Sequence, residues 1–347
     1  MRACGRFHQT YEEDARVFPT VLPRIALAVA LTGLATLPMW GSDYLVHLGV
    51  MSAIAVLSAT GLNLLTGIAG QLSIGQGAAM GVGAYGAAIL GIRFHWPLPL
   101  AIAGGVVLTA TAGLLVALPS YRIRGMYLLV STLAAQVLFT FAVVNLPQWT
   151  GGDLGLIVPR PWPDSSTHTR IFFWLTLAAA VAGVLYVRNL LRTRVGRALM
   201  SVRDNDLAAS VLGVDVARYK LLAFLLSSCY AGLAGGLLAY YLGILSYESF
   251  NLGMSVQYIS MILIGGLGSV SGVVAGAIFL GLLPEMLSNL AVAVRGVAGV
   301  DLSGQLAIAN KALFGLLIIF FLLLKPEGIG KLWADTKRYW KLWPFSY

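Results

Sequence analysis

Long apolar stretches separated by short polar connections run through most of the chain. About 20 apolar residues span the hydrocarbon core of a bilayer, so each stretch is read as a membrane-spanning helix. The ten predicted ranges are 22–40, 44–65, 73–92, 97–118, 125–146, 171–190, 220–243, 252–267, 270–290 and 305–324. Glycine and polar residues interrupt the third, eighth and ninth ranges. The pattern therefore predicts an all-α integral membrane protein with about ten transmembrane helices and Gly-rich broken segments.

The connections between these ranges divide into two sets by charge. If the N-terminus is cytoplasmic, 18 of the 23 Lys and Arg residues fall on the cytoplasmic side, as the positive-inside rule requires. The predicted organisation is a cytoplasmic segment 1–21, a transmembrane domain 22–325 with a cytoplasmic loop 192–219, and a cytoplasmic tail 326–347. Tryptophans and basic residues alternate in the tail, which is expected to lie on membrane lipid. Both termini are thus expected in the cytoplasm, beneath a bacterial plasma (inner) membrane.

Composition narrows the class of protein further. Of the 347 residues, 58% are apolar and 11% are charged, whereas soluble globular proteins carry about 25% charged residues. This balance excludes a water-soluble enzyme. The net charge of +9 does not indicate nucleic acid as a partner, because the basic residues are not gathered on one soluble face. Cys4 and Cys229 are too few and too far apart for a disulfide framework or a thiolate metal site.

The chain shows no motif for chemistry of its own. Its four histidines are scattered without the i, i+4 spacing of a helical metal site, so no metal is expected. The segment 81–86 formally matches GxGxxG, but it lies inside an apolar range rather than at a strand-to-helix turn. GxxxxGK[ST] does not occur, so energy must come from another subunit or from an ion gradient. We expect no catalytic residue and no cofactor in this chain.

The 40 glycines are spread through apolar segments, which indicates close packing of membrane helices. Small-residue spacing assigns this packing role to Gly77, Gly81, Gly232, Gly236, Gly268, Gly272 and Gly276. The densest stretch, 67–83, predicts a helix broken within the membrane, which is tolerated only where the break faces protein or water. A broken helix has free N–H groups that can hold a substrate carboxylate.

The polar residues at mid-depth in the predicted spans are uncharged. A zwitterionic solute needs such a path, because a fixed charge in the membrane is costly and would trap it. These mid-depth residues are Thr60, Asn63, Ser131, Thr132, Gln136, Ser227, Ser228 and Ser260. Each hydroxyl is most simply bonded to its own helix, whereas an amide needs more partners. The candidate pathway residues are therefore Asn63 and Gln136, together with Gln71, Ser73 and Gln76 from the broken segment.

The longest predicted cytoplasmic connection, 192–218, contains helical stretches broken at Gly196 and Gly213. Apolar residues stand among its charges at Val202, Leu207, Val211 and Leu212. Exposed apolar residues on a short helix need a surface that buries them. Two interpretations remain open: the helix lies against the protein's own inner ends, or it docks into a groove on a soluble partner.

Four separated blocks resemble one family. Residues 206–213, DLAASVLG, resemble the coupling loop of ABC importer permeases, whose signature is Glu-Ala-Ala, three residues, then Gly. Leu207 stands where the signature has Glu, with Asp206 beside it. The block 196–220 is similar to the branched-chain amino acid permeases of the LivM type. So are GLNLLTG with GQLSIGQGA at 61–78, TGGDLGL at 150–156, and Ser249-Phe250 followed by IGGLGS at 264–269. The family often has His where this chain has Gln76.

The resemblance implies the ABC importer permease fold and a permease subunit for branched-chain or related hydrophobic amino acids. It implies a second homologous permease, an extracytoplasmic substrate-binding protein, and two cytoplasmic ATPases that bind the ATP and Mg. The residues it assigns to ATPase coupling are Gly196, Arg203, Asp206, Leu207, Ala208, Ala209 and Gly213.

An ion-coupled secondary transporter or a channel for a small polar solute is the alternative function. A proton-coupled transporter would need an intramembrane carboxylate, and none stands at mid-depth in the predicted spans. A sodium-coupled transporter stays open, because backbone carbonyls and hydroxyls are sufficient ligands for that ion.

Overall fold

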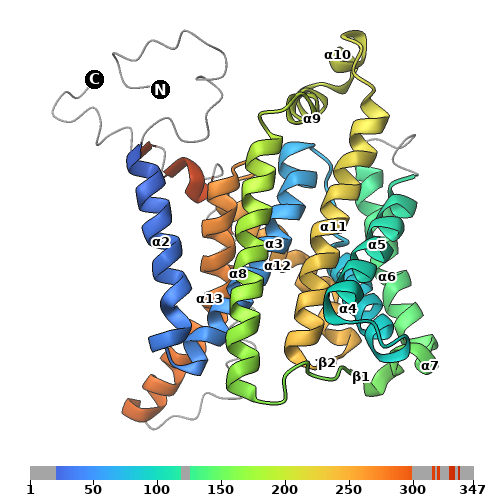
Figure 1. Ribbon diagram of the computed structural model, residues 1–347. Helices are drawn as coiled ribbons and strands as arrows, with labels where there is room; N and C mark the ends of the chain where they lie inside the picture. Colours follow the sequence, from blue (N-terminus) through green and yellow to red (C-terminus); the bar gives the residue numbers. More distant parts are fainter. Residues whose placement is uncertain are drawn as a thin grey trace, which may run out of the picture.

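The computed structural model describes residues 21–118 and 126–298, together with the short pieces 315–316, 319–320, 328–332 and 335–336. The predicted segment 1–21, apart from Val21, and most of the range 305–324 and of the tail 326–347 lie outside the described residues. Figure 1 shows the long helices side by side, running between two ends of the molecule. One end carries α9 (Arg194–Asp204) and α10 (Asp206–Val211), and the other carries α7 (Pro147–Thr150) and the two short strands.

Helices occupy the first nine predicted ranges. They are α2 (Val21–Trp40), α3 (Asp43–Asn63), α4 (Gln76–Arg93), α5 (Leu98–Ala117), α6 (Met126–Asn145), α8 (Ser165–Leu190), α11 (Val216–Leu242), α12 (Leu252–Gly265) and α13 (Val270–Ala298). Among the described residues, five helices are long and apolar enough to cross a membrane. These are Asp43–Ile68, Leu98–Ala117, Tyr127–Asn145, Ser165–Leu190 and Val216–Leu242. The protein is an all-α membrane protein, and the count of ten spans stays a prediction.

Two helices begin earlier than their apolar ranges because polar residues cap them. The Asp164 carboxylate accepts the backbone N–H of Thr167, so α8 begins at Ser165 rather than at 171. Hydroxyl groups of Thr167 and Ser166 also donate to Asp164 and hold the pKa of that carboxyl below its usual value. In the same way Asp215 accepts the backbone N–H of Arg218, and α11 begins at Val216.

Helix α11 lies at the centre and packs against α3, α4 and α5, while α3 also packs against α8 and α13. Glycines allow these backbones to approach closely. A methyl group on Gly83 would lie 2.5 Å from the Cα of Gly232, and one on Gly235 would overlap the carbonyl oxygen of Met80. The α4–α11 crossing is therefore a contact of backbone on backbone.

Six of the seven predicted packing glycines lie in helices against a neighbour. The groups that a methyl at each would meet are Asn251 for Gly77, Phe139 for Gly81, Thr109 for Gly232, Ile102 for Gly236, Gly265 for Gly272, and Met261 for Gly276. Gly268 instead lies in the turn between α12 and α13, with φ of 80°. It is needed there for its backbone conformation, which disfavours a residue with a Cβ atom.

The chain breaks after α3, as the glycine-rich segment predicts. Helix α3 continues into a π-helix, η1 (Leu64–Ile68), and residues 69–75 are not helical. Gly70 has φ of 70° at the start of this stretch, and α4 then begins at Gln76. The break is therefore shorter than 67–83, because Gly77, Gly81 and Gly83 lie within α4. The formal GxGxxG match at 81–86 also lies inside that helix.

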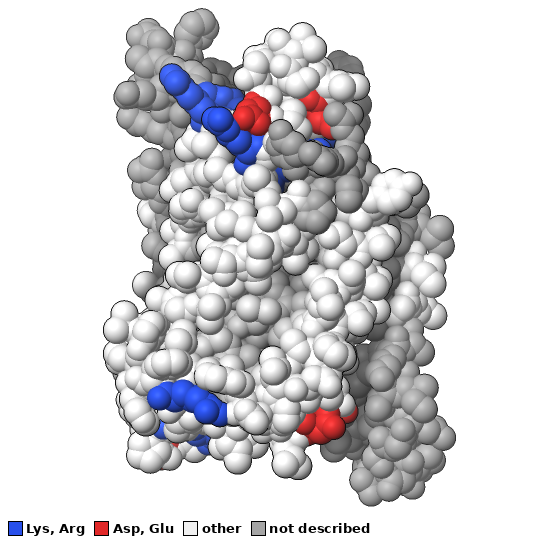
Figure 2. Space-filling view, turned by 90° about the vertical axis from the view of Figure 1, so that its right-hand side faces the viewer, with Lys and Arg blue, Asp and Glu red and all other residues white. Residues whose placement is uncertain are grey.

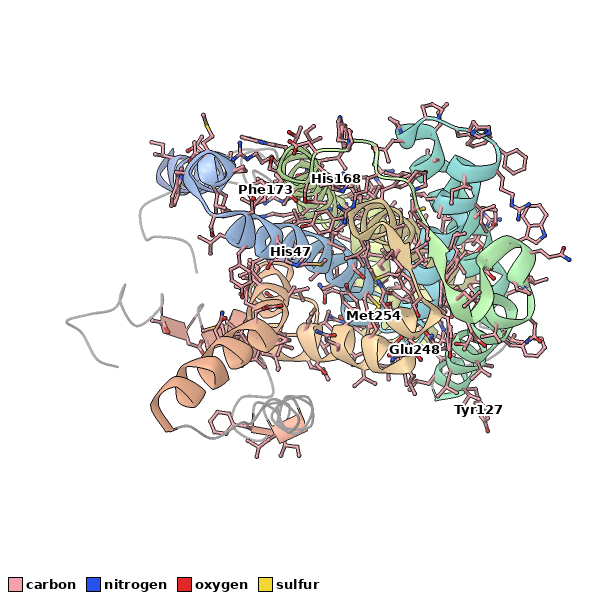
Figure 3. The ribbon with its side chains drawn as sticks, turned by 90° about the horizontal axis from the view of Figure 1, so that it is seen from below. His47, Tyr127, His168, Phe173, Glu248 and Met254 are labelled. Atoms are coloured by element: carbon pink, nitrogen blue, oxygen red, sulfur yellow. The ribbon has the colours of Figure 1, made fainter. Side chains whose placement is uncertain are left out.

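At the end opposite α10, the TGGDLGL motif forms a tight turn before a short antiparallel pair of strands. Strand β1 (Leu156–Ile157) pairs with β2 (Ile244–Leu245), and Gly151, Gly152 and Gly155 all have positive φ. In the view of Figure 3, His47 and His168 lie on neighbouring helices near this end. Tyr241 lies between them, with its hydroxyl 2.7 Å from His47 Nδ1 and its ring stacked on that of His168.

Candidate functional site

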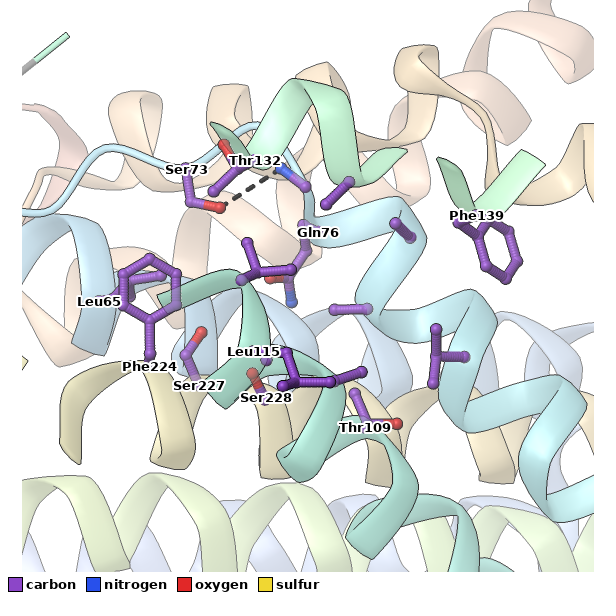
Figure 4. A pocket seen from close by; sticks show the side chains of 18 of the residues that line it. Leu65, Ser73, Gln76, Thr109, Leu115, Thr132, Phe139, Phe224, Ser227 and Ser228 are labelled. Atoms are coloured by element: carbon purple, nitrogen blue, oxygen red, sulfur yellow. Dashed lines mark hydrogen bonds between the residues drawn. The ribbon is translucent and has the colours of Figure 1, made fainter. Parts of the chain in front are cut away.

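A cavity of about 330 Å³ lies between α4, α5, α6 and α11, directly beside the broken segment. Its polar lining consists of Ser73, Gln76, Thr109, Thr132, Ser227 and Ser228 (Figure 4). The other lining residues are apolar or glycine, including Leu65, Val82, Phe139 and Phe224. No charged side chain is among the described residues that line it. Small-molecule sites have volumes of this order and a similar mixture of many apolar and few polar groups.

The break in the chain brings Ser73, Gly75 and Gln76 to the cavity. Thr132 of α6 accepts the backbone N–H of Ile74 at 3.1 Å and so fixes this segment against α6. The buried Gln76 amide donates to the carbonyl oxygen and to the hydroxyl of Ser58, at 3.2 and 2.8 Å. The orientation of Gln76 is therefore set by α3, on which Ser58 lies.

Side chains satisfy two of the N–H groups at the start of α4. Gly77 donates to the hydroxyl of Ser255 at 2.8 Å, and Ala78 donates to Oε1 of Gln136 at 2.7 Å. These two donors are therefore not free for a substrate carboxylate, contrary to the expectation for a broken helix. The hydroxyls and the amide on the cavity wall are the polar groups that a solute would meet.

The five predicted pathway residues divide into two groups. Ser73 and Gln76 line the cavity, whereas Asn63, Gln71 and Gln136 do not. Asn63 accepts the backbone N–H of Gly268 at 2.9 Å and joins α3 to the α12–α13 turn. The Gln71 side chain is buried, and its amide atoms have no hydrogen-bond partner within the described part of the chain. A role of these residues in the pathway stays a prediction.

Several cavity residues are hydroxyls that sequence reasoning assigned to their own helices. Thr132, Ser227 and Ser228 line the cavity, and Thr109 was not singled out at all. Thr109 also bonds its own helix, donating to the carbonyl oxygen of Gly105 at 2.8 Å. A hydroxyl can thus bond its own helix and still face a cavity, so the sequence offers no signal that separates the two roles.

Replacing Gln136 is expected to lower the stability of the protein strongly, because its side chain bonds two separate segments. Besides accepting from Ala78, its amide donates to the carbonyl oxygen of Phe250 at 2.6 Å. Gln136→Leu leaves both buried backbone groups without a partner, at about 1–3 kcal/mol each, so we expect a loss of about 2–6 kcal/mol in unfolding free energy. This change is measured by unfolding the protein in detergent and monitoring the loss of its helical circular dichroism signal.

Thr140→Val is the matched control for Gln136→Leu. Thr140 lies one turn further along α6 and donates only within that helix, to the carbonyl oxygen of Gln136 at 3.2 Å. Its replacement is expected to change the unfolding free energy by about 0.5 kcal/mol or less, as for substitutions away from buried networks. Equal stability of the two variants would contradict the capping role of Gln136.

The predicted cytoplasmic loop contains two short helices with different surroundings. On α9, Leu199 and Val202 are buried, and a methyl group on Gly196 would overlap the backbone of Leu190 and Leu191. On α10 and in the turn after it, Leu207, Val211 and Leu212 are 60%, 86% and 80% exposed. Helix α9 therefore lies against the protein's own helices, while α10 presents an apolar surface with no cover among the described residues.

Polar contacts hold α10 in place. Asn205 Oδ1 accepts the backbone N–H groups of Leu207 and Ala208, and Asp206 forms an ion pair with Lys220 of α11 at 3.6 Å. Ala208 is exposed and Ala209 is buried. Gly213 ends the helix with φ of 84°, a conformation that favours glycine, and the space around its Cα is open.

On the face shown in Figure 2, the coloured Lys, Arg, Asp and Glu residues lie near the top and the bottom, and a broad band of uncharged residues separates them. Such a band is the surface that the hydrocarbon of a bilayer requires. The helix lengths, the uncharged band and the uncharged, mostly apolar cavity together describe a membrane protein with a small-molecule-sized site among its helices.

The comparison with protein families decides the class. The sequence pattern of the family described as "Branched-chain amino acid transport system / permease component" matches residues 44–322. The chain belongs to this permease family. The matched range contains the cavity, the broken segment and the α9–α10 loop.

Curated relatives carry the same permease description. The chain is 30% identical over 300 residues to the high-affinity branched-chain amino acid transport system permease protein LivM of Salmonella typhimurium, covering 78% of this chain and 70% of the relative. It is 26% identical over 256 residues to LivH of Escherichia coli strain K12, covering 67% of this chain and 81% of the relative. The probable LivM protein of Methanocaldococcus jannaschii is 26% identical over 234 residues, covering 66% of this chain and 67% of the relative. No solved structure matches this permease.

Proposed function

We propose that this chain is the permease subunit of an ATP-driven ABC importer and forms part of the membrane pathway for branched-chain or related hydrophobic amino acids. The observation that carries the proposal is the uncharged cavity beside the broken segment, in a chain of the branched-chain amino acid permease family. The relatives named LivM and LivH support the same substrate class.

The chemistry of the cavity suits such a substrate. A branched-chain amino acid has one apolar side chain and a zwitterionic end. The apolar walls accept the side chain, and hydroxyls such as Ser73 and Ser227 can bond either the carboxylate or the ammonium group. Because no charged group lines the described cavity, neither end of the zwitterion is held too tightly for release.

The partners and the topology form the second part of the proposal. Two cytoplasmic ATPases bind the ATP and Mg and contact the exposed face of α10. A second, homologous permease completes the pathway. An extracytoplasmic binding protein delivers the substrate. The exposed apolar side chains of α10 support a docking role. In this arrangement α9, α10 and both termini lie in the cytoplasm, about ten helices span a bacterial inner membrane, and the tail 326–347 lies on its lipid surface.

Reconstitution tests the function directly. The complete complex in proteoliposomes, with ATP enclosed and the binding protein outside, is expected to accumulate radiolabelled leucine. A non-hydrolysable ATP analogue is expected to prevent accumulation. Leucine uptake that persists without ATP and stops when an ionophore dissipates the ion gradient would identify a secondary transporter instead.

Val211→Glu tests the docking surface on α10. Val211 is 86% exposed, so the substitution adds a charge to the apolar face without disturbing a buried contact. Desolvation of that charge at an interface is expected to weaken binding of the ATPases by about tenfold, which corresponds to about 1.4 kcal/mol. Co-purification of the ATPases with the permease measures the effect. Val211→Leu, which keeps the surface apolar, is expected to bind as the wild type does, and equal binding by both variants would remove α10 from the interface.

A further inference from the structure

The last turn of α9 reaches the point where the membrane helix breaks. Arg203 donates from Nη1 to the carbonyl oxygen of Gly67, at 3.1 Å. Its Nε and Nη2 atoms donate to the Asp204 carboxylate at 3.0 and 2.9 Å. A side chain of the loop between α8 and α11 is thus bonded to the backbone of η1, which is 136 residues away in sequence.

The Gly67 carbonyl is a favourable acceptor for a cation. It lies in the last turn of the α3–η1 helix, where carbonyl oxygens lack partners within the helix. The same end carries the negative pole of the helix dipole, which stabilises a nearby positive charge. The planar guanidinium of Arg203 serves this carbonyl and the Asp204 carboxylate at the same time, which an ammonium group does less well.

Glycine backbones leave the space that this side chain occupies. A methyl group on Gly70 would lie 2.7 Å from Cγ of Arg203, and one on Gly268 would lie 3.2 Å from its Nη1. A methyl group on Gly67 would overlap Asn63 Oδ1 and the backbone nitrogen of Gly268. The Arg203 guanidinium therefore lies where η1, the broken segment and the α12–α13 turn meet.

This meeting point is next to the cavity. The residue two positions before Gly67, Leu65, lines the cavity, and its carbonyl oxygen accepts the backbone N–H of Gln71 at 3.0 Å. Thr66 donates to the carbonyl oxygen of Gln71 at 3.2 Å, so η1 and the start of the broken segment form one bonded unit. That segment continues to Ser73, Gly75 and Gln76 on the cavity wall.

We propose that Arg203 is a positioning residue that transmits displacement of the α9–α10 loop through the Gly67 carbonyl to the broken segment 69–75, and so to the cavity wall. The inference rests on the proposed function, because the ATPases supply the displacement. Helix α9 is suited to this task, since Leu199 and Val202 fix it to the membrane helices while α10 extends from it. The resemblance assigns Arg203 to ATPase coupling, and the bond from its Nη1 atom to the Gly67 carbonyl offers a physical route for that coupling into the membrane helix.

The test uses the complete complex in proteoliposomes and compares Arg203→Gln with Arg203→Lys. For Arg203→Gln, ATP hydrolysis stimulated by the binding protein is expected to stay within about twofold of wild type. Leucine uptake is expected to fall by about tenfold, because the charge-assisted hydrogen bond to the Gly67 carbonyl is lost. Arg203→Lys keeps the charge and is expected to recover part of the uptake. Arg194→Ala, an exposed arginine at the start of the same helix, is the control and is expected to match wild type in both measurements.

A reporter on the cavity wall provides a measurement that does not depend on uptake. In a chain with Cys4→Ser, Cys229→Ser and Ser73→Cys, the rate at which a maleimide alkylates the new thiol is expected to differ severalfold between the nucleotide-free and the ATP-trapped complex. Adding Arg203→Gln is expected to abolish this difference. The same difference with and without Arg203 would overturn the proposal.

The remaining outcomes separate this inference from the proposed function. Wild-type uptake by Arg203→Gln would overturn the transmission role. A parallel loss of ATP hydrolysis and uptake would also overturn it, because that result would place Arg203 at the ATPase contact. Failure of the wild-type complex to accumulate leucine with ATP would refute the proposed function itself. If Arg203→Gln does not assemble, the alkylation experiment is carried out with Arg203→Lys instead. If that variant loses uptake but keeps the wild-type difference in alkylation rate between the two nucleotide states, the transmission role of Arg203 is overturned.

Discussion

Replacing Gly235 with leucine is expected to destabilise the folded permease strongly. At this position in α11, a Cβ atom would overlap the carbonyl oxygen of Met80, and it would lie 2.8 Å from the carbonyl carbon of Met80 and 3.1 Å from the backbone nitrogen of Ala84. All three groups belong to the backbone of α4, which cannot turn aside as a side chain can. Overpacking a core commonly costs 1–3 kcal/mol, and separating two helix backbones is expected to cost about 3 kcal/mol or more.

The fraction of protein that elutes as a single species in size-exclusion chromatography, together with the unfolding free energy in detergent, measures this loss. Gly33→Leu is the control: Gly33 lies in α2, and among the described residues no atom beyond its own stretch of helix lies within 4 Å of its added Cβ. The control gains helix propensity and is expected to behave as wild type. A Gly235→Leu variant as stable as Gly33→Leu would show that the α4–α11 contact is looser than the structure has it.

The glycine pattern predicts that such contacts exist but not which helices make them. Small residues four apart are typical of any close helix crossing, so the sequence marks Gly232 and Gly236 without naming a partner. An added Cβ at Gly232 would meet Thr109 of α5, and one at Gly236 would lie 3.4 Å from Ile102 of α5 and 3.5 Å from Ala87 of α4, while one at Gly235 would meet the α4 backbone. The small residues of α11 are therefore shared between two neighbouring helices. That assignment depends on the rotation of α11, which spacing alone does not determine.

The positions of the membrane helices are predictable because apolar length is a direct requirement of the bilayer. Their ends are less predictable, since a helix continues through polar residues until a cap stops it. Asp164 and Asp215 begin α8 and α11 outside the apolar ranges for this reason. Position 171 marks where the apolar stretch starts, while Ser165 marks where the hydrogen bonds start.

The sequence predicts only some of the cavity residues, because a buried amide side chain can either line a cavity or bond to backbone groups. Gln76 lines the cavity, whereas Gln136 satisfies an N–H group at the start of α4 and a carbonyl 114 residues away. Both are uncharged, both are buried, and both stand in apolar surroundings, so nothing in the sequence distinguishes them. The difference arises from which helix end lies opposite each side chain. The break at 69–75 was visible in the glycine pattern, but the side chains that complete its hydrogen bonds come from α6 and α12.

The two halves of the α9–α10 loop have different surroundings. Its apolar residues are divided between α9 and α10, and Asn205 separates the two helices. Val202 is buried before that break, and Val211 is exposed after it. The loop is therefore anchored at one half and open at the other. A lever that carries movement from a soluble partner to a membrane helix needs this combination.

Filling the cavity is expected to stop transport without unfolding the protein. Ala135 lies on the cavity wall contributed by α6, and a tryptophan there would place an indole ring in a space of about 330 Å³ that an amino acid must share. The ring would take up much of this volume and leave too little room for the substrate. Leucine uptake by the reconstituted complex with Ala135→Trp is expected to fall by about tenfold or more. Uptake of radiolabelled leucine, measured beside ATP hydrolysis, checks this result.

Ala134→Trp provides a matched control for the blocked cavity, because the same substitution is placed one residue earlier on the same helix. Ala134 is exposed and does not line the cavity, so its indole ring would extend from the outer face of α6. Tryptophan is well tolerated on such membrane-facing surfaces, and uptake is expected to match wild type. Equal uptake by both variants would place the pathway outside this cavity, for instance at the contact with the second permease. Equal loss in both, with intact assembly, would show that α6 itself must move for transport, since only one of the two rings enters the cavity.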